Sequence, residues 1–441
     1  MRRICLALPT NRPCTPAISA THREALYAAQ HFGVEVHLLI LDSSDAFAYR
    51  QHAAAVRELP AAPGVTTHHL DEAAQREFLY EVIDRSGADK PGLMLDLMLP
   101  SALSYGACTN RAFLFAAALG CASVHRRDSD STYQAAAPGG EPVFPVHHEL
   151  RTLGSTAGEA AAAVSALDLD ARHTGKPVSM VGSSFIGEMS VDIEEMYRLD
   201  PETYYEVVGL WAPFDWPAAR KREFAGDSFR GAGQEPFTAD HSTLTLVDPM
   251  RVDMCNIAFH GVHESVPLPP ATDTIGSDYF LIHLVHDATL PAVLHNRNIV
   301  NHYTPERRTD PGFMAYHLRF AKFFLSMHYL NFVYERMERA GESLLDDRHR
   351  VRGGAIVDLL WESSRLDPAQ NVRRLDVLDR AYRRLGGRYA EFADRLAAGR
   401  ERLIDEARRD VEDFALLTEA WPALIDAAGT TSPGRSRQRP A

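Results

Sequence analysis

The sequence contains few cysteines, no long uninterrupted apolar run and no excess of basic residues. Its five cysteines are scattered without a C-x-x-C pair, which gives no zinc-site spacing and fits a reducing compartment. Every long apolar stretch carries a charge or a histidine, so neither a membrane-spanning helix nor a membrane partner is expected. The net charge of −13 argues against binding nucleic acid through its phosphates. These absences predict a soluble cytoplasmic protein, and the Ala- and Arg-rich composition indicates a bacterial one.

The first forty-five residues have the pattern of a strand, a helix and a second strand. Residues 2–8 form a short apolar run that ends in the turn cluster Pro9-Thr10-Asn11-Arg12-Pro13, without the long apolar region and cleavage site of a signal peptide. A helical pattern over 15–32 stops at Gly33, and the apolar strand 34–41 ends in Asp42-Ser43-Ser44-Asp45. This βαβ unit predicts a parallel sheet, whose ligands bind at the carboxyl ends of the strands.

The stretch 104–132 predicts a helix, a stop at Gly120, a short strand over 122–126 and the acidic turn Asp128-Ser129-Asp130. Two carboxylates at the end of a buried strand are costly unless something neutralises them. Mg²⁺ or Mn²⁺ would do so, because these cations prefer carboxylate oxygens and share their coordination shell with substrate phosphates. The alternative is a solvated turn that caps the next segment.

These pieces, in this order, resemble the glycosyltransferase-A fold, especially its family-2-like enzymes that use nucleotide-diphosphate sugars. The resemblance rests on P-T-x-N-R after the first strand, an Asp/Ser-rich turn after the second, Gly106 to Asn110 as G-x-x-x-N at a helix start, and D-x-D at Asp128 to Asp130. It implies an α/β fold with a mostly parallel sheet flanked by helices. It covers 1–132, is weaker from 178 to 308, and does not include the C-terminal helical extension.

The resemblance also implies roles for single residues. Asp130 would bind the metal, and Asp128 would contact the sugar or ribose and the metal. The remaining residues implied to bind the sugar nucleotide are Pro9, Thr10, Asn11, Arg12, Asp42, Asn110 and Arg111. Thr10 and Asp42 would hold the nucleoside, and Arg12 its phosphates or ribose. Plain turn or cap chemistry remains open for Thr10 and Asn110, and Arg111 could instead pair with an acidic group.

Three later residues complete the expected site. His302 stands where the family's metal shell receives a histidine from a late strand, with a packed strand-end histidine as the alternative. Asp278, at a helix start, is the expected general base, although the family's preceding Glu is absent and a helix cap is the other interpretation. Glu188 is a rival acid for the acceptor. The Gly-rich stretch 225–238 is a candidate lid.

The expected function is metal-dependent, non-processive transfer of a sugar from a nucleotide-diphosphate sugar, with a UDP-sugar favoured, to a small-molecule or peptidic acceptor. A nucleotidyltransferase or a catalytically silent binding protein on the same scaffold are the alternatives. The expected organisation is a catalytic domain over 1–308, a helical region over 309–428 and a disordered tail over 429–441. A homo-oligomer through the C-terminal helices is allowed, and the Tyr, Phe and Met stripes of these helices are read as packing.

Overall fold

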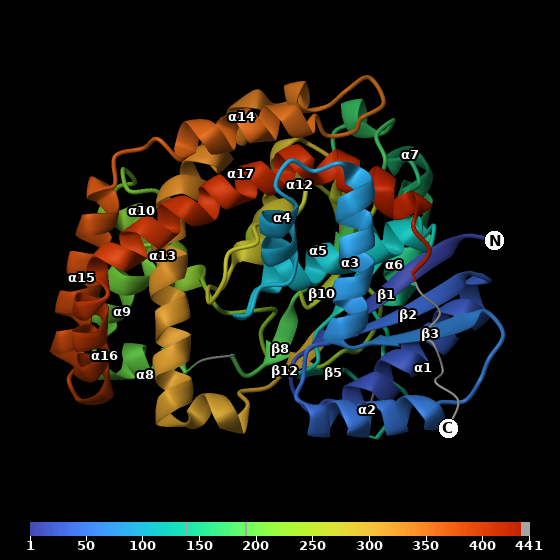
Figure 1. Cartoon of the computed structure of the whole chain (residues 1–441), viewed down its shortest axis with the longest axis horizontal. Coiled ribbons are helices and arrows are strands. Elements are labelled where there is room, and N and C mark those ends of the chain that lie inside the picture. Colours follow the sequence, from blue (N-terminus) through green and yellow to red (C-terminus); the bar gives the residue numbers. More distant parts are fainter. Residues whose placement is uncertain (137–138, 190–191, 434–441) are drawn as a thin grey trace.

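The computed structural model describes residues 1–136, 139–189 and 192–433, and within them nine strands form one large sheet (Figure 1). The strand order is β3-β2-β1-β4-β10-β7-β11-β9-β6. The first four strands are parallel, whereas β10 is antiparallel to both of its neighbours. Their bounds are β1 Arg3–Thr10, β2 Glu35–Asp42, β3 Val65–Leu70, β4 Val124–Arg127, β6 Ala166–Asp168, β7 Met180–Gly182, β9 Ser242–Thr245, β10 Asn256–Phe259 and β11 Ala292–His295.

A smaller sheet of three strands lies beside the carboxyl end of β4. It consists of β5 Ser131–Tyr133, β12 Ile299–Asn301 and β8 Phe185–Gly187 in the order β5-β12-β8. Asn301 is paired with Ser131, directly after the acidic turn. Segments about 170 residues apart in the chain are thereby brought together beside the carboxyl end of β4.

Helices cover both faces of the large sheet, as predicted (Figure 1). Alternate residues of β1 point to opposite faces, so Leu6 packs in the cluster with α1, and Ala7 packs in the cluster with α3 and α5. Helix α3 is capped by Asp71 at its N-terminus and by Gly87, in the left-handed conformation, at its C-terminus. The helices are α1 Thr15–Phe32, α2 Ala46–Glu58, α3 Glu72–Ser86, α4 Pro91–Met98, α5 Tyr105–Ala118, α6 Val146–Thr152, α7 Ala157–Ala160, α8 Ile193–Leu199, α9 Pro201–Val208, α10 Ala218–Asp227, α11 Val262–Ser265, α12 Phe280–Asp287, α13 Asp310–Ala340, α14 Gly353–Ser363, α15 Ala369–Leu385, α16 Gly387–Ala398 and α17 Arg400–Thr430.

The C-terminal helices pack onto the sheet-bearing part of the chain. Helix α17 runs across α3 and α5, and Trp421 donates its Nε1–H to the carbonyl of His263 at 3.0 Å (Figure 1). One hydrophobic cluster contains residues of β1, α5, α13 and α17, so the regions 1–308 and 309–428 share a core. Helix α17 includes Gly429 and Thr430, at the start of the predicted tail, while residues 434–441 lie outside the described part of the chain. None of the helices in the described ranges is both long and apolar enough to cross a membrane.

Candidate functional site

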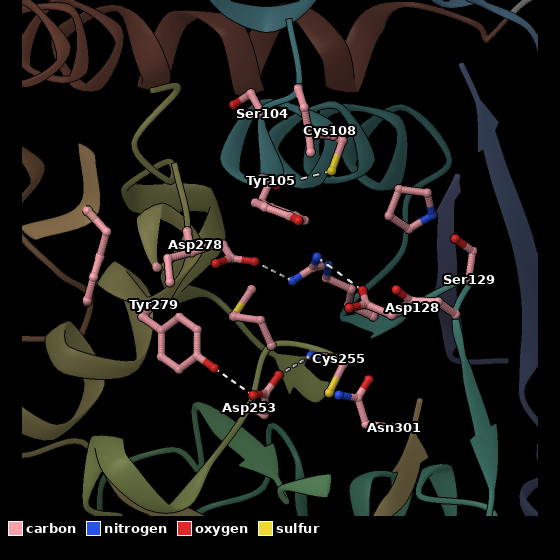
Figure 2. Close-up of a pocket in the computed structure, with 18 of the residues that line it drawn as sticks. Ser104, Tyr105, Cys108, Asp128, Ser129, Asp253, Cys255, Asp278, Tyr279 and Asn301 are labelled. Carbon is pink, nitrogen blue, oxygen red and sulfur yellow. Dashed lines mark hydrogen bonds and ion pairs between the residues drawn. The ribbon is translucent and has the colours of Figure 1, made fainter. Parts of the chain in front are cut away.

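A cavity of about 380 Å³ opens at the carboxyl ends of β1 and β4, within the size range of small-molecule sites. Helix α5 closes one side of it, and the turn after β4 forms its floor. Figure 2 shows Asp128, Asp253 and Asp278 directed into this space from three separate segments. The charged residues that line it near β4 are Arg12, Arg126, Asp128, Asp130, Asp253, Asp278 and Arg307.

The position of the charges follows from the alternation of side chains along β4. Arg126 lines the cavity, whereas Arg127 lies on the other face of the strand. There Arg127 forms a bidentate pair with Glu24 of α1, at 2.9 and 2.7 Å, and lies 2.9 Å from Glu149 of α6. Glu149 also accepts from His125 at 2.7 Å. Burial opposes ionisation of Glu149, but Arg127 and His125 overcome it and lower its pKa to about 2.

On the cavity side, the guanidinium of Arg126 joins two carboxylates. Its Nη1 donates to Oδ2 of Asp278 at 2.8 Å, and its Nη2 lies 3.1 Å from Oδ1 of Asp128. Burial raises the pKa of Asp278 despite Arg126. For Asp128, burial together with the charges of neighbouring carboxylates raises the pKa to about 6, against the lowering effect of Arg126. Asp128 can therefore exchange a proton near neutral pH, and the pKa of Asp278 is shifted in the same direction.

Asp130 is held by two further guanidiniums. Its Oδ2 lies 3.1 Å from Nη1 of Arg12 and accepts from Nη2 of Arg307 at 2.8 Å. Arg307 belongs to the short 3₁₀ helix Pro305–Arg308, which follows β12. From the same helix, Glu306 accepts from Arg12 at 2.9 Å. The segment after β12 therefore closes over the acidic turn through ion pairs.

Two N–H groups of these guanidiniums have nothing to bind. Nε of Arg126 and Nη1 of Arg307 are buried and have no hydrogen-bond partner within residues 1–136, 139–189 and 192–433. A buried donor left unpaired costs about 1–3 kcal/mol, more for a charged group. Both guanidinium side chains also line the cavity, so their positive charges would attract an anionic ligand there.

Asp253 and Tyr279 form the wall opposite β4 (Figure 2). The hydroxyl of Tyr279 donates to Oδ2 of Asp253 at 2.6 Å, and the backbone N–H of Cys255 donates to Oδ1 at 3.1 Å. Asp253 comes from the loop that enters β10, the antiparallel neighbour of β4. This pairing brings a third carboxylate to the cavity.

The structure places the first predicted motif in the cavity wall. Pro9, Thr10, Asn11 and Arg12 all line it, and the N–H of Arg12 donates to Oγ1 of Thr10 at 3.3 Å. The motif is therefore both a turn and a lining segment.

Asp42 ends β2 as predicted, but its side chain is buried and does not line the cavity. Oδ2 is 2.7 Å from Nδ1 of His52 and 2.8 Å from Nε2 of His69, and Ser44 donates to Oδ1. The backbone N–H of Cys14 donates to Nε2 of His52 at 2.9 Å, so the proton of this ring is on Nδ1 and points to Asp42. Although three ligand atoms converge here, this tautomer leaves His52 as a hydrogen-bond donor and not as a metal ligand.

Asn110 and Gly106 fasten α5 to the segment that follows α11. The amide of Asn110 donates to the carbonyl of Leu268 and accepts from its N–H, both at 2.8 Å, and Asn110 is outside the cavity lining. A Cβ on Gly106 would lie 1.9 Å from the carbonyl oxygen of Pro269. Arg111 lines the cavity but donates to Gln75 and to the carbonyl of Met98. The G-x-x-x-N spacing thus has a packing role in this chain.

His302 and Glu188 lie outside the cavity lining. His302 is exposed and lies 3.1 Å from Oγ1 of Thr132. Glu188 accepts from the N–H of Tyr303 and from Arg308, on the outer side of the small sheet. The structure therefore does not bring His302 to Asp128 and Asp130, nor Glu188 to Asp278.

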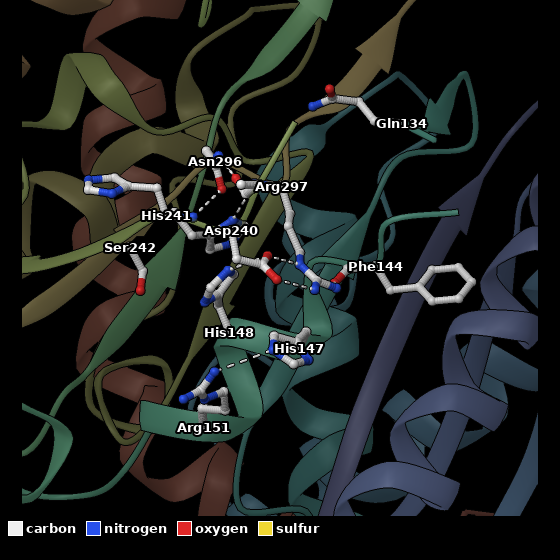
Figure 3. A network of polar contacts seen from close by, with 12 residues as sticks. Gln134, Phe144, His147, His148, Arg151, Asp240, His241, Ser242, Asn296 and Arg297 are labelled. Atoms are coloured by element: carbon white, nitrogen blue, oxygen red, sulfur yellow. Dashed lines mark hydrogen bonds and ion pairs between the residues drawn. The ribbon is translucent and has the colours of Figure 1, made fainter. Parts of the chain in front are cut away.

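The candidate lid 225–238 contributes Asp227, Phe229, Arg230 and Gly231 to the cavity wall. Its C-terminal end is tied down by a polar network (Figure 3). Asp240 accepts from Nε and Nη2 of Arg297 at 2.6 and 2.9 Å and lies 3.0 Å from His148, while Gln134 accepts from the N–H of Phe237. The segment is thereby anchored at one end beside the site.

The residues Arg126, Asp253 and Arg307 were not predicted from the sequence. Arg126 had a local signal, because a charged residue two positions before Asp128 in a strand must point to the same side as Asp128. Asp253 and Arg307 had none, since strand pairing alone brings them to the acidic turn.

A family model described as a family of unknown function (DUF6271) matches residues 2–437. No curated protein matches the chain. Among solved structures, the chain is similar to a mannosyltransferase from Pyrobaculum calidifontis described in complex with GDP-Man and Mn²⁺, with 14% identity, 98% of this chain and 87% of that chain covered, and a TM-score of 0.33. It is also similar to mouse xyloside xylosyltransferase 1, with 12% identity, 46% of this chain and 60% of that chain covered, and a TM-score of 0.20. Both neighbours are glycosyltransferases, but TM-scores this low assign neither fold nor function.

Proposed function

We propose that this chain, which belongs to the DUF6271 family of unknown function, is a glycosyltransferase of the GT-A type that transfers a sugar from a nucleotide-diphosphate sugar to a small-molecule acceptor. One observation carries the proposal: the cavity at the ends of β1 and β4 combines the acidic turn with three guanidinium side chains, those of Arg12, Arg126 and Arg307. Phosphate oxygens are the acceptors that such donors fit best. The strand-end position supports the same assignment.

The donor's diphosphate would lie between Arg12, Arg126 and Arg307. All three side chains line the cavity, and each is held in place by at least one carboxylate. Charge builds on the diphosphate as the sugar leaves, so fixed guanidiniums stabilise the transition state more than the ground state. The nucleoside would lie toward the Pro9-Thr10-Asn11 turn.

The acidic turn fits a divalent cation, Mn²⁺ or Mg²⁺, held jointly with the substrate. Contacts of the described residues engage Oδ1 of Asp128 and Oδ2 of Asp130, and the second oxygen of each carboxylate is left for a ligand. His302 is not placed to add a third ligand, so diphosphate oxygens and water would complete the shell. When bound, the cation would add electrostatic stabilisation to the leaving diphosphate.

Asp278 is the proposed general base. It is nearly buried, with 8% of its side chain exposed, and Arg126 fixes its orientation from Nη1. In a direct displacement, the acceptor oxygen bonds to the anomeric carbon as the bond to the diphosphate breaks, and Asp278 takes the hydroxyl proton. The products are the glycosylated acceptor and the nucleoside diphosphate.

Calorimetric titration with UDP, GDP and dTDP, each with and without Mn²⁺, tests the donor site. We expect one nucleotide to bind, with Asp130→Asn weakening the effect of Mn²⁺. Arg307→Gln should weaken binding by about tenfold to a hundredfold, the loss expected for charge-assisted hydrogen bonds. Asp168→Asn, an exposed carboxylate of β6, is the matched control and should bind like the wild type. Absence of binding by all three nucleotides, and by their sugar conjugates, would overturn the proposal.

A further inference from the structure

One part of the cavity wall is apolar and aromatic. It is built by Trp211 after α9, Phe229 after α10, and Phe323 and Met327 of α13. Phe323 and Met327 are buried, whereas Trp211 and Phe229 are partly exposed to the cavity. None of these four side chains carries a charge or a strong hydrogen-bonding group apart from the indole N–H. This half of the cavity therefore differs chemically from the half that would receive the donor.

The rings of this wall are held in fixed relative positions. The centroid of Trp211 lies 5.2 Å from that of Phe323 and 5.5 Å from that of Phe229. Phe229 also packs against Phe320, at 5.6 Å. Its φ of 62° is in the left-handed region, which a bulky residue adopts only when its surroundings impose it. The surrounding structure therefore holds the ring of Phe229 in the cavity wall despite the strain in its backbone.

The buried titratable groups beside the apolar wall, His283 and Tyr334, are uncharged at neutral pH. His283 lines the same end of the cavity and stacks on Tyr334 with centroids 3.8 Å apart, and burial lowers the pKa of His283 to about 3. Burial also raises the pKa of Tyr334. Asp227 and Arg230 reach the cavity from side chains that are 73% and 69% exposed, at its rim. A charged or strongly hydrated group placed against Phe323 would lose its hydration without compensation.

The apolar wall adjoins the proposed base. Gly276, two residues before Asp278, has a φ of 70°, and a Cβ built on it would lie 2.5 Å from Cε2 of Phe323. The backbone at Gly276 is therefore in close contact with the ring of Phe323, and Asp278 follows two residues later. A planar molecule resting on this wall would have its edge beside Asp278.

We infer that the acceptor is a neutral small molecule with a flat apolar ring system and a hydroxyl group, and not a sugar or a peptide. This inference rests on the proposed function, because it assigns the second substrate of the same site. The ring would pack on Phe323, Trp211 and Met327, and the hydroxyl oxygen would attack the anomeric carbon while its proton passes to Asp278. Sugars and peptides would bring polar groups that the wall cannot satisfy.

Binding of 2-naphthol to the wild-type chain without nucleotide, followed by saturation-transfer NMR and calorimetry, tests the inference. Maltose and the peptide Gly-Ser-Gly are the comparison ligands. We expect 2-naphthol to bind with a Kd below about 1 mM and the comparison ligands not to bind. Met327→Gln keeps the side-chain length but adds an amide, and it should weaken binding by about tenfold. Phe214→Leu alters an aromatic residue that is 41% exposed and outside the cavity lining, and it should leave binding unchanged.

The outcomes separate this inference from the proposed function. Failure of 2-naphthol to bind, tighter binding of maltose or the peptide, or an unchanged Kd in a folded Met327→Gln variant would each overturn the inference. If nucleotides still bind in those cases, the proposed function stands. Binding of 2-naphthol at the apolar wall without binding of any nucleotide or nucleotide sugar would instead overturn the proposed function, and the acceptor role with it.

Discussion

Arg126 donates to Asp278 across the cavity at 2.8 Å, and this bond joins the end of β4 to the short 3₁₀ helix Ser277–Tyr279. A carboxylate that is nearly buried and paired on one side is held in one orientation, with its other oxygen available. This is the arrangement that general-base catalysis requires. Because Asp278→Asn can keep this hydrogen bond, the substitution tests the proton-accepting role of Asp278 alone.

Asp278→Asn should lower kcat for sugar transfer by about 10²–10⁴-fold, because an amide cannot accept the acceptor's proton. The amide oxygen can still accept from Arg126, so the Kd for the nucleoside diphosphate should stay within about threefold of the wild-type value. Steady-state kinetics with the donor identified by calorimetry give both quantities. An unchanged kcat would remove Asp278 from the mechanism.

Glu24→Gln should destabilise the chain by about 3–5 kcal/mol, because it removes the carboxylate of a fully buried bidentate ion pair and leaves Glu149 alone to compensate the charge of Arg127. Urea denaturation followed by circular dichroism measures the free energy of unfolding. Glu35→Gln is the control: it breaks an exposed pair with Arg3 and should cost less than about 1 kcal/mol. Equal effects of the two substitutions would contradict the buried-network account.

Gly276→Ala should cost about 2–4 kcal/mol, since it adds left-handed backbone strain to a clash with the ring of Phe323. Combination with Phe323→Leu should recover part of the loss, because the clash is then relieved and the strain remains. Gly92→Ala provides the comparison, as it lies in α4 with nothing within 4 Å and should be neutral or slightly stabilising. Thermal unfolding of the wild type and these three variants checks the order.

Asp410 makes stability fall as pH rises. Burial raises its pKa to about 7, against the lowering effect of Lys322, whereas an unfolded aspartate has a pKa of about 3.9. Between these values the folded state binds more protons than the unfolded state, so its stability decreases with increasing pH through this window. Asp410→Asn should flatten the dependence of Tm on pH between 4 and 7 and raise Tm at pH 8. A steeper dependence in the variant would contradict the sign.

Much of the fold, and the position of the cavity at two strand ends, could be predicted from the sequence for local reasons. The ends of β1 and β4 were identified because apolar runs meet polar turns there, and both turns line the cavity. Asp42 was placed correctly at a strand end, but its burial by His52 and His69 depends on residues from α2 and β3. Asn110 was expected to bind the sugar nucleotide because it belongs to the G-x-x-x-N motif, but its side-chain amide forms hydrogen bonds with the backbone of Leu268. Pairing between distant strands decided these outcomes, and no local pattern encodes it.

The two faces of β4 also bear on how the chain folds. A slip of this strand by one residue would turn Arg126 and Asp128 toward Glu24 and Glu149, and would send Arg127 into the cavity. Such a slip would bring the carboxylate of Asp128 beside those of Glu24 and Glu149, where the like charges would repel one another. The ion pairs of Arg127 with Glu24 and Glu149 thus disfavour a shift in the register of β4, and they fix which face of the strand lines the cavity.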